Sequence, residues 1–227
     1  MGQVSAQYQR PTLPQSDMPY TLYGSPGSGS AAVEMALRAA DLEYRVVRTS
    51  EWEPGPALRE LQAINPLGQI PTLILPGGTV LTESAAILIH LGLAHPGHGL
   101  LPETLDERAV TLRGLVFIAA NCYPAVSISD YPARWTTATT QPAQERVRSA
   151  ARAQLHRSWD IFADAFGAEL ARTQADPGAL AFLSVVVSRW SGARQHLKAK
   201  RADFEHLLLG LEAHPRIAAV LHEHRDA

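Results

Sequence analysis

Apolar positions in the first third of the chain alternate between strand spacing and helix spacing. Short runs rich in branched or aromatic residues predict strands at 20–23, 44–47, 72–75 and 80–82. Helical spacing predicts helices at 31–40, around Leu58, Leu61 and Ile64, and at 85–93. A strand, helix, strand unit implies a parallel pair, and the turn at 76–78 adds an antiparallel pair. We therefore expect an α/β domain of order βαβαββα with a mixed four-stranded sheet.

After the Pro- and Gly-rich stretch 95–104, the apolar pattern becomes wholly helical. It predicts long helices through 112–119 and 151–166, and further helices through 180–190, 204–211 and 217–221. We expect a flexible tail at 1–17, an α/β domain at 18–94, a linker at 95–104 and an all-α domain at 105–227. Met18 is a candidate natural start, because the segment before it is polar and aperiodic.

The stretch 65–84, NPLGQIPTLILPGGTVLTES, combines a turn, a hairpin and a helix start. Pro71 opens a strand, where a cis bond would leave the backbone of Ile70 free to pair with an extended peptide. Glu83 and Ser84 begin the next helix, and a helix start attracts carboxylates through its free amides and its dipole. The stretch therefore predicts a site for a small peptide with a carboxylate.

These residues resemble the glutathione site of the glutathione S-transferase superfamily, whose motif reads approximately NPxGxVPxL and ends in an acidic or polar residue plus Ser. The resemblance implies a thioredoxin-like domain followed by an all-helical domain, a homodimer, and glutathione as co-substrate. It also implies that the backbone of Ile70 beside cis Pro71 binds the cysteinyl part, while Glu83 and Ser84 hold the γ-glutamyl end. Gln69 is placed to reach the glycyl carboxylate; the alternative is a solvated turn residue.

Three serines in the loop GSPGSGS are candidates to activate the thiol. A free thiol has a pKa of about 8.5, so an enzyme that uses it as a nucleophile must favour the thiolate. The pattern GxPxS resembles serine-type transferases and implies that Ser28 donates to the thiolate, with Ser25 and Ser30 as alternates. The competing interpretation is that these serines only cap the following helix.

The same loop excludes a cysteine mechanism at this position. Beta-class members of the superfamily read PGACS where this chain reads PGSGS, which places Gly29 at the cysteine position. Tyr23, on the first strand, is expected to be packed rather than catalytic. The single cysteine, Cys122, is expected to be a small buried apolar side chain.

Polar and aromatic residues after the 112–119 helix are candidates for the electrophile pocket, namely Asn121, Cys122, Tyr123, Ser127, Tyr131 and Trp135. Of these we select Tyr123, Ser127 and Tyr131, with core packing as the alternative. In the family, the central helix of the second domain opens with a Ser or Thr capping box; here those positions hold Gly178 and Ala181. Thr173 and Asp176 have the same spacing five residues earlier, so we expect the helix to start near Asp176.

The amino-acid composition limits the classes of partner that we expect for this chain. Twenty Lys and Arg against 22 Asp and Glu give a net charge of -2, which favours neither nucleic acid nor an anionic membrane. A single cysteine fits the cytoplasm, and no apolar run reaches the roughly 20 residues of a membrane span. His222 and His224 do not share a helix face, so we expect no metal. The basic run 194–201 is interpreted as a solvated face.

The leading hypothesis is a glutathione transferase, with a role in detoxification, that adds the thiol of glutathione to a small, soluble, hydrophobic electrophile. One alternative is a glutathione-dependent peroxidase, disulfide reductase or isomerase, because the same binding site would serve those reactions. Another is a non-catalytic binding or interaction module, favoured by the altered cap and the absence of a clear catalytic Tyr or Cys.

Overall fold

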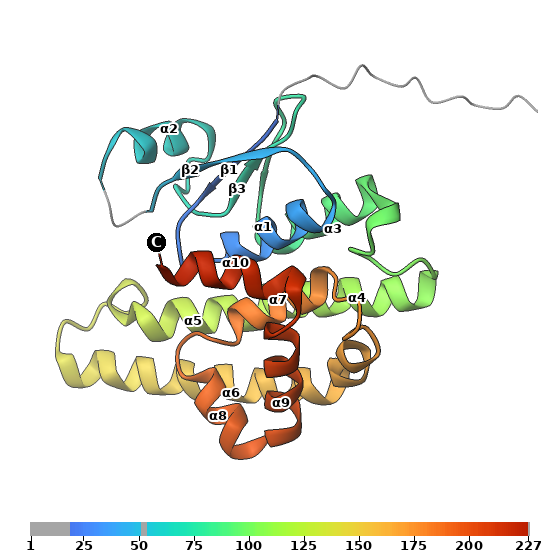
Figure 1. The fold of residues 1–227 in the computed structure, drawn as a ribbon. Coiled ribbons are helices and arrows are strands. Elements are labelled where there is room, and N and C mark those ends of the chain that lie inside the picture. Colours follow the sequence, from blue (N-terminus) through green and yellow to red (C-terminus); the bar gives the residue numbers. More distant parts are fainter. Residues whose placement is uncertain (1–18, 51–53, 227) are drawn as a thin grey trace, which may run out of the picture.

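The N-terminal part of the chain is built on a four-stranded mixed sheet (Figure 1). The computed structural model describes residues 19–50 and 54–226, so the expectations for the tail at 1–17 and for Met18 lie outside it. The strands are β1 (Tyr20–Gly24), β2 (Tyr44–Arg48), β3 (Thr72–Ile74) and β4 (Val80–Thr82), in the order β2-β1-β3-β4. β1 is parallel to β2 and antiparallel to β3, and β3 is antiparallel to β4. The predicted α/β fold is confirmed.

Helices cover both faces of this sheet. α1 (Ser30–Ala39) and α3 (Ser84–Ala94) lie between the sheet and the helical part, and α2 (Pro56–Ile64) lies on the other side (Figure 1). Successive side chains of β1 point to opposite faces, so Leu22 enters the main core while Tyr23 points toward α2. The Tyr23 hydroxyl donates to Glu60 at 2.5 Å and the side chain is buried, which confirms that Tyr23 is packed.

The rest of the described chain is helical and is organised around α7. Its helices are α4 (Leu105–Phe117), α5 (Tyr123–Asp130), α6 (Gln141–Arg172), α7 (Ala179–Val187), α8 (Ala193–Lys200), α9 (Ala202–Glu212) and α10 (Pro215–Asp226), with short 3₁₀ turns η1 (Pro96–His98) and η3 (Pro132–Arg134). Every residue of α7 is buried, and α7 packs against α1 and α4. Gly114 permits the close crossing, since a Cβ there would lie 2.7 Å from Leu180. The boundaries 18–94, 95–104 and 105–227 remain a proposal.

The helix that begins at Leu105 does not end before Pro124, as the sequence suggested. It continues through a π-helical turn, η2 (Ile118–Cys122), directly into α5. Pro124 has no N–H for an α-helical bond, and the wider π turn accommodates it without breaking the helix. Within the described residues, the stretch 105–130 is long and apolar enough to cross a membrane by length and composition. It packs here against α6 and α7.

The start of α7 differs from the prediction. The helix begins at Ala179 rather than near Asp176, and no side chain caps it at Gly178. The Asp176 carboxylate instead pairs with Arg216 at 2.6 Å. The amide of Ala179 donates to the Leu100 carbonyl at 2.9 Å, so backbone from the connector takes the place of a side-chain cap.

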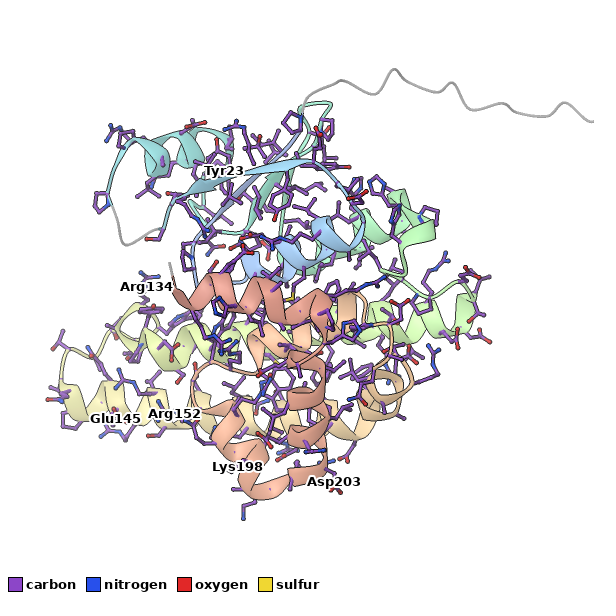
Figure 2. The ribbon with its side chains drawn as sticks, viewed as in Figure 1. Tyr23, Arg134, Glu145, Arg152, Lys198 and Asp203 are labelled. Atoms are coloured by element: carbon purple, nitrogen blue, oxygen red, sulfur yellow. The ribbon has the colours of Figure 1, made fainter. Side chains whose placement is uncertain are left out.

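The basic run is not a uniformly solvated face. Arg194 is mostly buried, donates to Glu212 at 2.7 Å and to the Ser188 hydroxyl at 2.9 Å, and has its pKa lowered by that burial. Lys198 and Lys200 do extend into solvent, as Figure 2 shows for Lys198. Helical periodicity explains the difference, because the run turns only one of its faces toward α9.

Candidate active site

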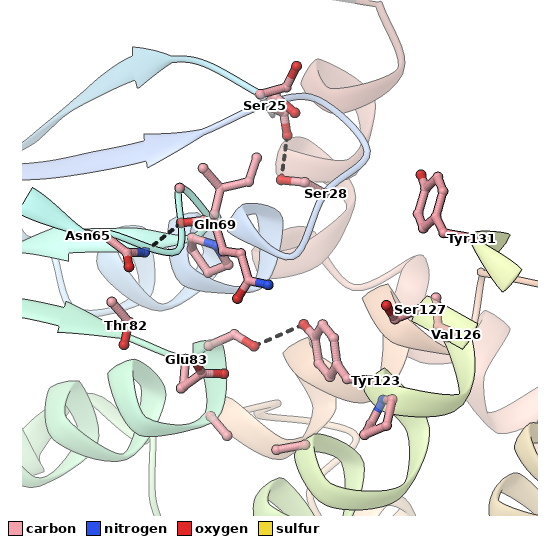
Figure 3. Close-up of a pocket in the computed structure, with 18 of the residues that line it drawn as sticks. Ser25, Ser28, Asn65, Gln69, Thr82, Glu83, Tyr123, Val126, Ser127 and Tyr131 are labelled. Atoms are coloured by element: carbon pink, nitrogen blue, oxygen red, sulfur yellow. Dashed lines mark hydrogen bonds between the residues drawn. The ribbon is translucent and has the colours of Figure 1, made fainter. Parts of the chain in front are cut away.

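A cavity of about 490 Å³ lies between the sheet, the loop after β1 and α5 (Figure 3). It brings together all but one of the site residues predicted from sequence. From the N-terminal part these are Ser25, Ser28, Gln69, Ile70, Pro71, Glu83 and Ser84, and from the helical part Tyr123, Ser127 and Tyr131. Ser30 is completely buried and does not line the cavity. The cavity brings these residues together, and the role of each one remains a prediction.

Asn65 holds the turn before β3 in place. Its side-chain amide donates to the Gln69 carbonyl at 3.1 Å and to the Thr72 hydroxyl at 3.0 Å, while its oxygen accepts from the Leu67 amide at 3.2 Å. The Ile70–Pro71 bond is cis. The side chain of Gln69 extends toward the space in front of Tyr123 (Figure 3). Asn65 thus fixes the segment whose backbone faces the cavity.

The start of α3 faces the same cavity. Glu83, Ser84 and Ala85 all line it, so the positive end of the helix dipole is directed at a bound ligand. Glu83 has a positive φ of 64°, a conformation rare for a residue with a side chain, and its carboxylate is exposed. An acid beside free helix amides offers one place for an ammonium group and another for a carboxylate.

The serine loop is a tight turn stabilised by its own hydroxyls. Pro26 followed by Gly27, with φ of +72°, is typical of a type II turn, and the Ser28 amide closes it on the Ser25 carbonyl at 3.3 Å. The Ser28 hydroxyl donates to the same carbonyl at 2.7 Å and accepts from the Ser30 amide at 3.2 Å. It also lies 2.9 Å from the Ser30 hydroxyl. Ser28 therefore supports the helix start while lining the cavity.

Tyr123 closes the cavity from the helical side. Its hydroxyl lies 2.9 Å from the Ser84 hydroxyl, and burial raises the pKa of Tyr123 to about 12. A Cβ at Gly29 would lie only 2.8 Å from this hydroxyl. The phenol therefore occupies the space above the first turn of α1 and is neutral at physiological pH.

Comparison with known proteins identifies the N-terminal part. A family described as glutathione S-transferase, N-terminal domain, matches residues 22–99. Residues 22–99 therefore carry a domain of the glutathione S-transferase N-terminal family. The match covers the sheet, the cis Pro71 edge and the start of α3, which are the features that build one side of the cavity.

Two relatives and two solved structures illustrate the similarity to glutathione transferases. The chain is 37% identical over 127 residues to an uncharacterized GST-like protein, YncG, of Escherichia coli K12, covering 56% of this chain and 62% of that one. It is 32% identical over 116 residues to a probable maleylacetoacetate isomerase of Caenorhabditis elegans, covering 51% and 50%. The chain thus spans about half to three fifths of these relatives.

The structural matches extend over almost the whole chain. A glutathione S-transferase from Xylella fastidiosa has a TM-score of 0.74 at 22% identity, covering 91% of this chain and 98% of the other. A glutathione transferase homolog from Sulfitobacter, solved with bound glutathione, has a TM-score of 0.72 at 24% identity, covering 90% and 98%. They show that the transferase fold includes the helical part.

The mouth of the transferase cavity carries residues that the sequence analysis did not select. Arg134 and Trp135 line it beside Tyr131, and the Arg134 guanidinium lies 4.7 Å from the centre of the Tyr131 ring. Trp135 is 54% exposed, so the mouth presents aromatic surface and positive charge to solvent. The remaining unpredicted lining residues are Ser50, Asn65, Gly68, Thr82, Ala85, Ala119, Pro124 and Val126. The run YPARW could have indicated this mouth in the sequence, because a cation lies there between two aromatic residues.

Three further residues that the sequence analysis considered, Cys122, His222 and His224, do not line the cavity. Cys122 is buried, which raises the pKa of its thiol to about 12 and leaves it unreactive. His224 points inward and lies 2.8 Å from the Glu34 carboxylate, whereas His222 is exposed. Within residues 19–50 and 54–226, no three His, Cys, Asp or Glu side chains gather as a metal site would require.

Proposed function

We propose that this protein is a glutathione transferase that activates the thiol of glutathione for addition to a small, hydrophobic electrophile. One observation carries the proposal: the cis Ile70–Pro71 edge, the start of α3 and the Ser28 turn all face one cavity. Solved transferases of the same fold contain glutathione, and the N-terminal family match covers the residues on this side of the cavity.

The proposed binding mode assigns each end of glutathione to a different element. The backbone of Ile70 pairs with the cysteinyl part, as an added strand pairs with a sheet edge. Glu83 receives the γ-glutamyl ammonium, and the Ser84 hydroxyl with the α3 amides receives the adjacent carboxylate. Gln69 reaches the glycyl carboxylate. This mode places the sulfur near the first turn of α1.

In this mode Ser28 stabilises the thiolate. Its hydroxyl proton turns from the Ser25 carbonyl to the sulfur, while the Ser30 hydroxyl, 3.2 Å from the same carbonyl, keeps that acceptor satisfied. The thiol proton passes to solvent and sulfur forms a bond to the electrophilic carbon. The electron pair displaced from that carbon departs with a leaving group or, in an addition, takes up a proton at the other end of the double bond. Lowering the thiol pKa by two units requires about 2.7 kcal/mol of preferential stabilisation.

The ultraviolet thiolate band of bound glutathione, titrated with pH, tests the assignment. We expect a band near neutral pH in the wild type that moves to higher pH in Ser28→Ala, with glutathione affinity retained in calorimetry. Ser30→Ala is the matched control, because it alters the same turn without removing a group that lines the cavity. An unmoved band in Ser28→Ala would reject Ser28. Absence of glutathione binding would favour the interaction module instead.

Glutathione-dependent isomerisation is the second candidate. Relatives named as maleylacetoacetate isomerases, from Caenorhabditis elegans and Dictyostelium discoideum, support it. Arg134 at the mouth offers a cation for an acidic substrate. Turnover of maleylacetoacetate and of an aryl halide, compared in wild type and Arg134→Met, separates the two. A loss confined to the acid supports isomerisation, whereas activity on the halide alone supports transfer.

The remaining parts of the proposal concern context. We place the protein in the cytoplasm as a homodimer acting in detoxification, and sedimentation that gives a monomer would reject the dimer. Peroxide and disulfide reduction are disfavoured because Gly29 stands at the beta-class cysteine position and Cys122 is buried. Assays with peroxides and small disulfides test those reactions beside the transferase assay.

A further inference from the structure

The peptide groups of Gly27, in the middle of the serine turn, are held from the helical part of the molecule. The Gly27 amide donates to Nδ1 of His224 at 3.3 Å, and its carbonyl accepts from the indole N–H of Trp190 at 3.2 Å. His224 lies on α10, and Trp190 follows α7. The turn that carries Ser25 and Ser28 is therefore fixed by groups 197 and 163 residues away in sequence.

The contact with Gly27 requires one particular form of His224. Because the amide donates to Nδ1, that nitrogen carries a lone pair, and the imidazole proton is on Nε2. Nε2 lies 2.8 Å from Oε1 of Glu34, which accepts this proton. Both side chains are only 3% exposed. Glu34, the acid within the apolar face of α1, thus selects the tautomer that receives the turn.

Few other charges surround this pair. On α1, Arg38 pairs with Glu223 of α10 through two hydrogen bonds of 2.7 and 2.5 Å, and Arg48 at the end of β2 acts on Glu223 from a greater distance. The Arg38–Glu223 pair attaches α10 to α1 without touching Gly27. A variant of this pair therefore tests the attachment of α10 to α1 without altering the contact between His224 and Gly27.

We propose that His224, oriented by Glu34, is a positioning residue for the thiol-activating turn, and that its contact with the Gly27 amide exists only while His224 is neutral. Protonation places a second proton on Nδ1, opposite the Gly27 amide, so two donors face each other. The Nε2 bond to Glu34 survives that change and becomes an ion pair. Acid therefore removes this contact while α10 stays attached and Trp190 still holds the Gly27 carbonyl. The catalytic consequence rests on the proposed glutathione chemistry.

Two substitutions of His224 separate its two nitrogens. Asparagine places a side-chain oxygen near the position of Nδ1, and glutamine places its amide near the position of Nε2. We expect His224→Asn to lose less kcat/KM for glutathione than His224→Gln and to remove the His-dependent acid limb of its pH profile. Because it leaves the buried Glu34 carboxylate without its Nε2 donor, the melting temperature is measured alongside. His224→Gln loses the acceptor for Gly27, and we expect kcat/KM to fall about tenfold, the upper range for one hydrogen bond.

Two more variants distinguish positioning from simple packing. Glu34→Gln keeps an acceptor for Nε2 but removes the charge that favours the imidazolium, so the acid limb should move to lower pH. Glu223→Gln is the control on the same helix, and it should lower the melting temperature while leaving kcat/KM largely unchanged. Equal losses in His224→Asn and His224→Gln, with an unchanged pH profile in Glu34→Gln, would overturn the proposal.

Nuclear magnetic resonance of the unliganded protein tests the contact without any assumption about glutathione. Imidazole ¹⁵N shifts should show Nδ1 of His224 unprotonated at neutral pH. The protection factor of the Gly27 amide, which corrects for the intrinsic pH dependence of exchange, should fall when His224 is protonated. A proton on Nδ1 at neutral pH would overturn the proposal even in an active enzyme. If the turn responds as described but glutathione does not bind, the proposed function fails and the positioning contact stands.

Discussion

Gly29 and Tyr123 meet at the point where the two parts of the molecule build the cavity. The Tyr123 hydroxyl leaves no room for a side chain above the first turn of α1, since a Cβ at Gly29 would lie 2.8 Å from it and 3.4 Å from Pro71. This chain therefore has a phenol from α5 at the place to which the beta-class motif assigns a cysteine on α1. Packing therefore disfavours a cysteine at position 29.

Gly29→Ala is expected to lower the free energy of unfolding by about 1–3 kcal/mol, the usual cost of overpacking. Tyr123→Phe removes the oxygen that the new methyl group would meet, so the double variant should recover part of the loss. Urea unfolding of the two single variants and the double variant measures the coupling. Simple additivity of the two effects would show that this contact is relieved in another way.

At the scale of elements, α7 is a helix whose cap comes from outside. Gly178 lies so close to the connector that a Cβ there would lie 2.6 Å from the Gly99 carbonyl oxygen and 2.7 Å from that of Leu100. The capping box was lost at a position where the backbone of the connector both excludes a side chain and accepts the Ala179 amide. The usual rule that Ser caps a helix better than Gly is reversed by this crowding.

Gly178→Ser is accordingly expected to destabilise the protein by at least about 1 kcal/mol, although it restores a favoured capping residue. Thr104→Ala provides a comparison, because Thr104 caps α4 through the Glu107 amide at 3.4 Å and should lose about 1 kcal/mol on truncation. Both are measured by urea unfolding. A stabilised Gly178→Ser variant would contradict the packing argument.

Local pattern was sufficient for most elements and failed where distant backbone intervened. The strand at Val80–Thr82 and the helix that follows it were recognisable because turn residues and apolar runs delimit them within a few positions. The start of α7 and the continuity of the helix across Pro124 were not, since they depend on the connector and on a π turn. Propensity describes neighbours in sequence, whereas these ends are decided by neighbours in space.

Over the whole molecule, three acidic side chains keep their protons through burial: Cys122 and Tyr123 at the junction of the two parts, and Tyr23 on the side of the sheet that faces α2. Burial raises the pKa of the Cys122 thiol, the Tyr123 phenol and the Tyr23 phenol to about 12 each, and a hydrogen bond to Glu60 adds to the effect at Tyr23. The folded protein holds these protons more tightly than the unfolded chain. Their contribution to stability is therefore complete at low pH and is lost as the pH rises.

The free energy of unfolding should accordingly be insensitive to these groups below about pH 9 and fall progressively between about pH 9 and 12. Cys122 ionises first in the unfolded chain, so Cys122→Ala should postpone the onset to about pH 10, where tyrosine begins to ionise. Urea unfolding midpoints across this range measure both effects. An onset unchanged in Cys122→Ala would show that the thiol does not contribute.

The site was predictable where one segment builds it and not where two segments meet. The stretch from Asn65 to Ser84 was recognised from its motif, and the structure gathers those residues around the cavity. Glu34 pairs with His224, which lies 190 positions later in the chain. An isolated acid in an apolar helix does not indicate which distant residue will pair with it. The sequence analysis assigned no role to Glu34, although a buried carboxylate must be paired.

The π turn before Tyr123 has a consequence for how this helix tolerates insertions and deletions. A π turn contains one residue more than the α-helical turn it replaces, so it is equivalent to a single-residue insertion. Each residue of an α-helix corresponds to a rotation of about 100°. Deleting Ala120 would let the segment close as an ordinary α-helix. Because the loss of one residue and the loss of the wider turn compensate for each other, Tyr123 would keep its direction relative to α4. The phenol would stay beside Ser84 and Gly29, so the helix can lose a residue at this point while the cavity keeps its wall.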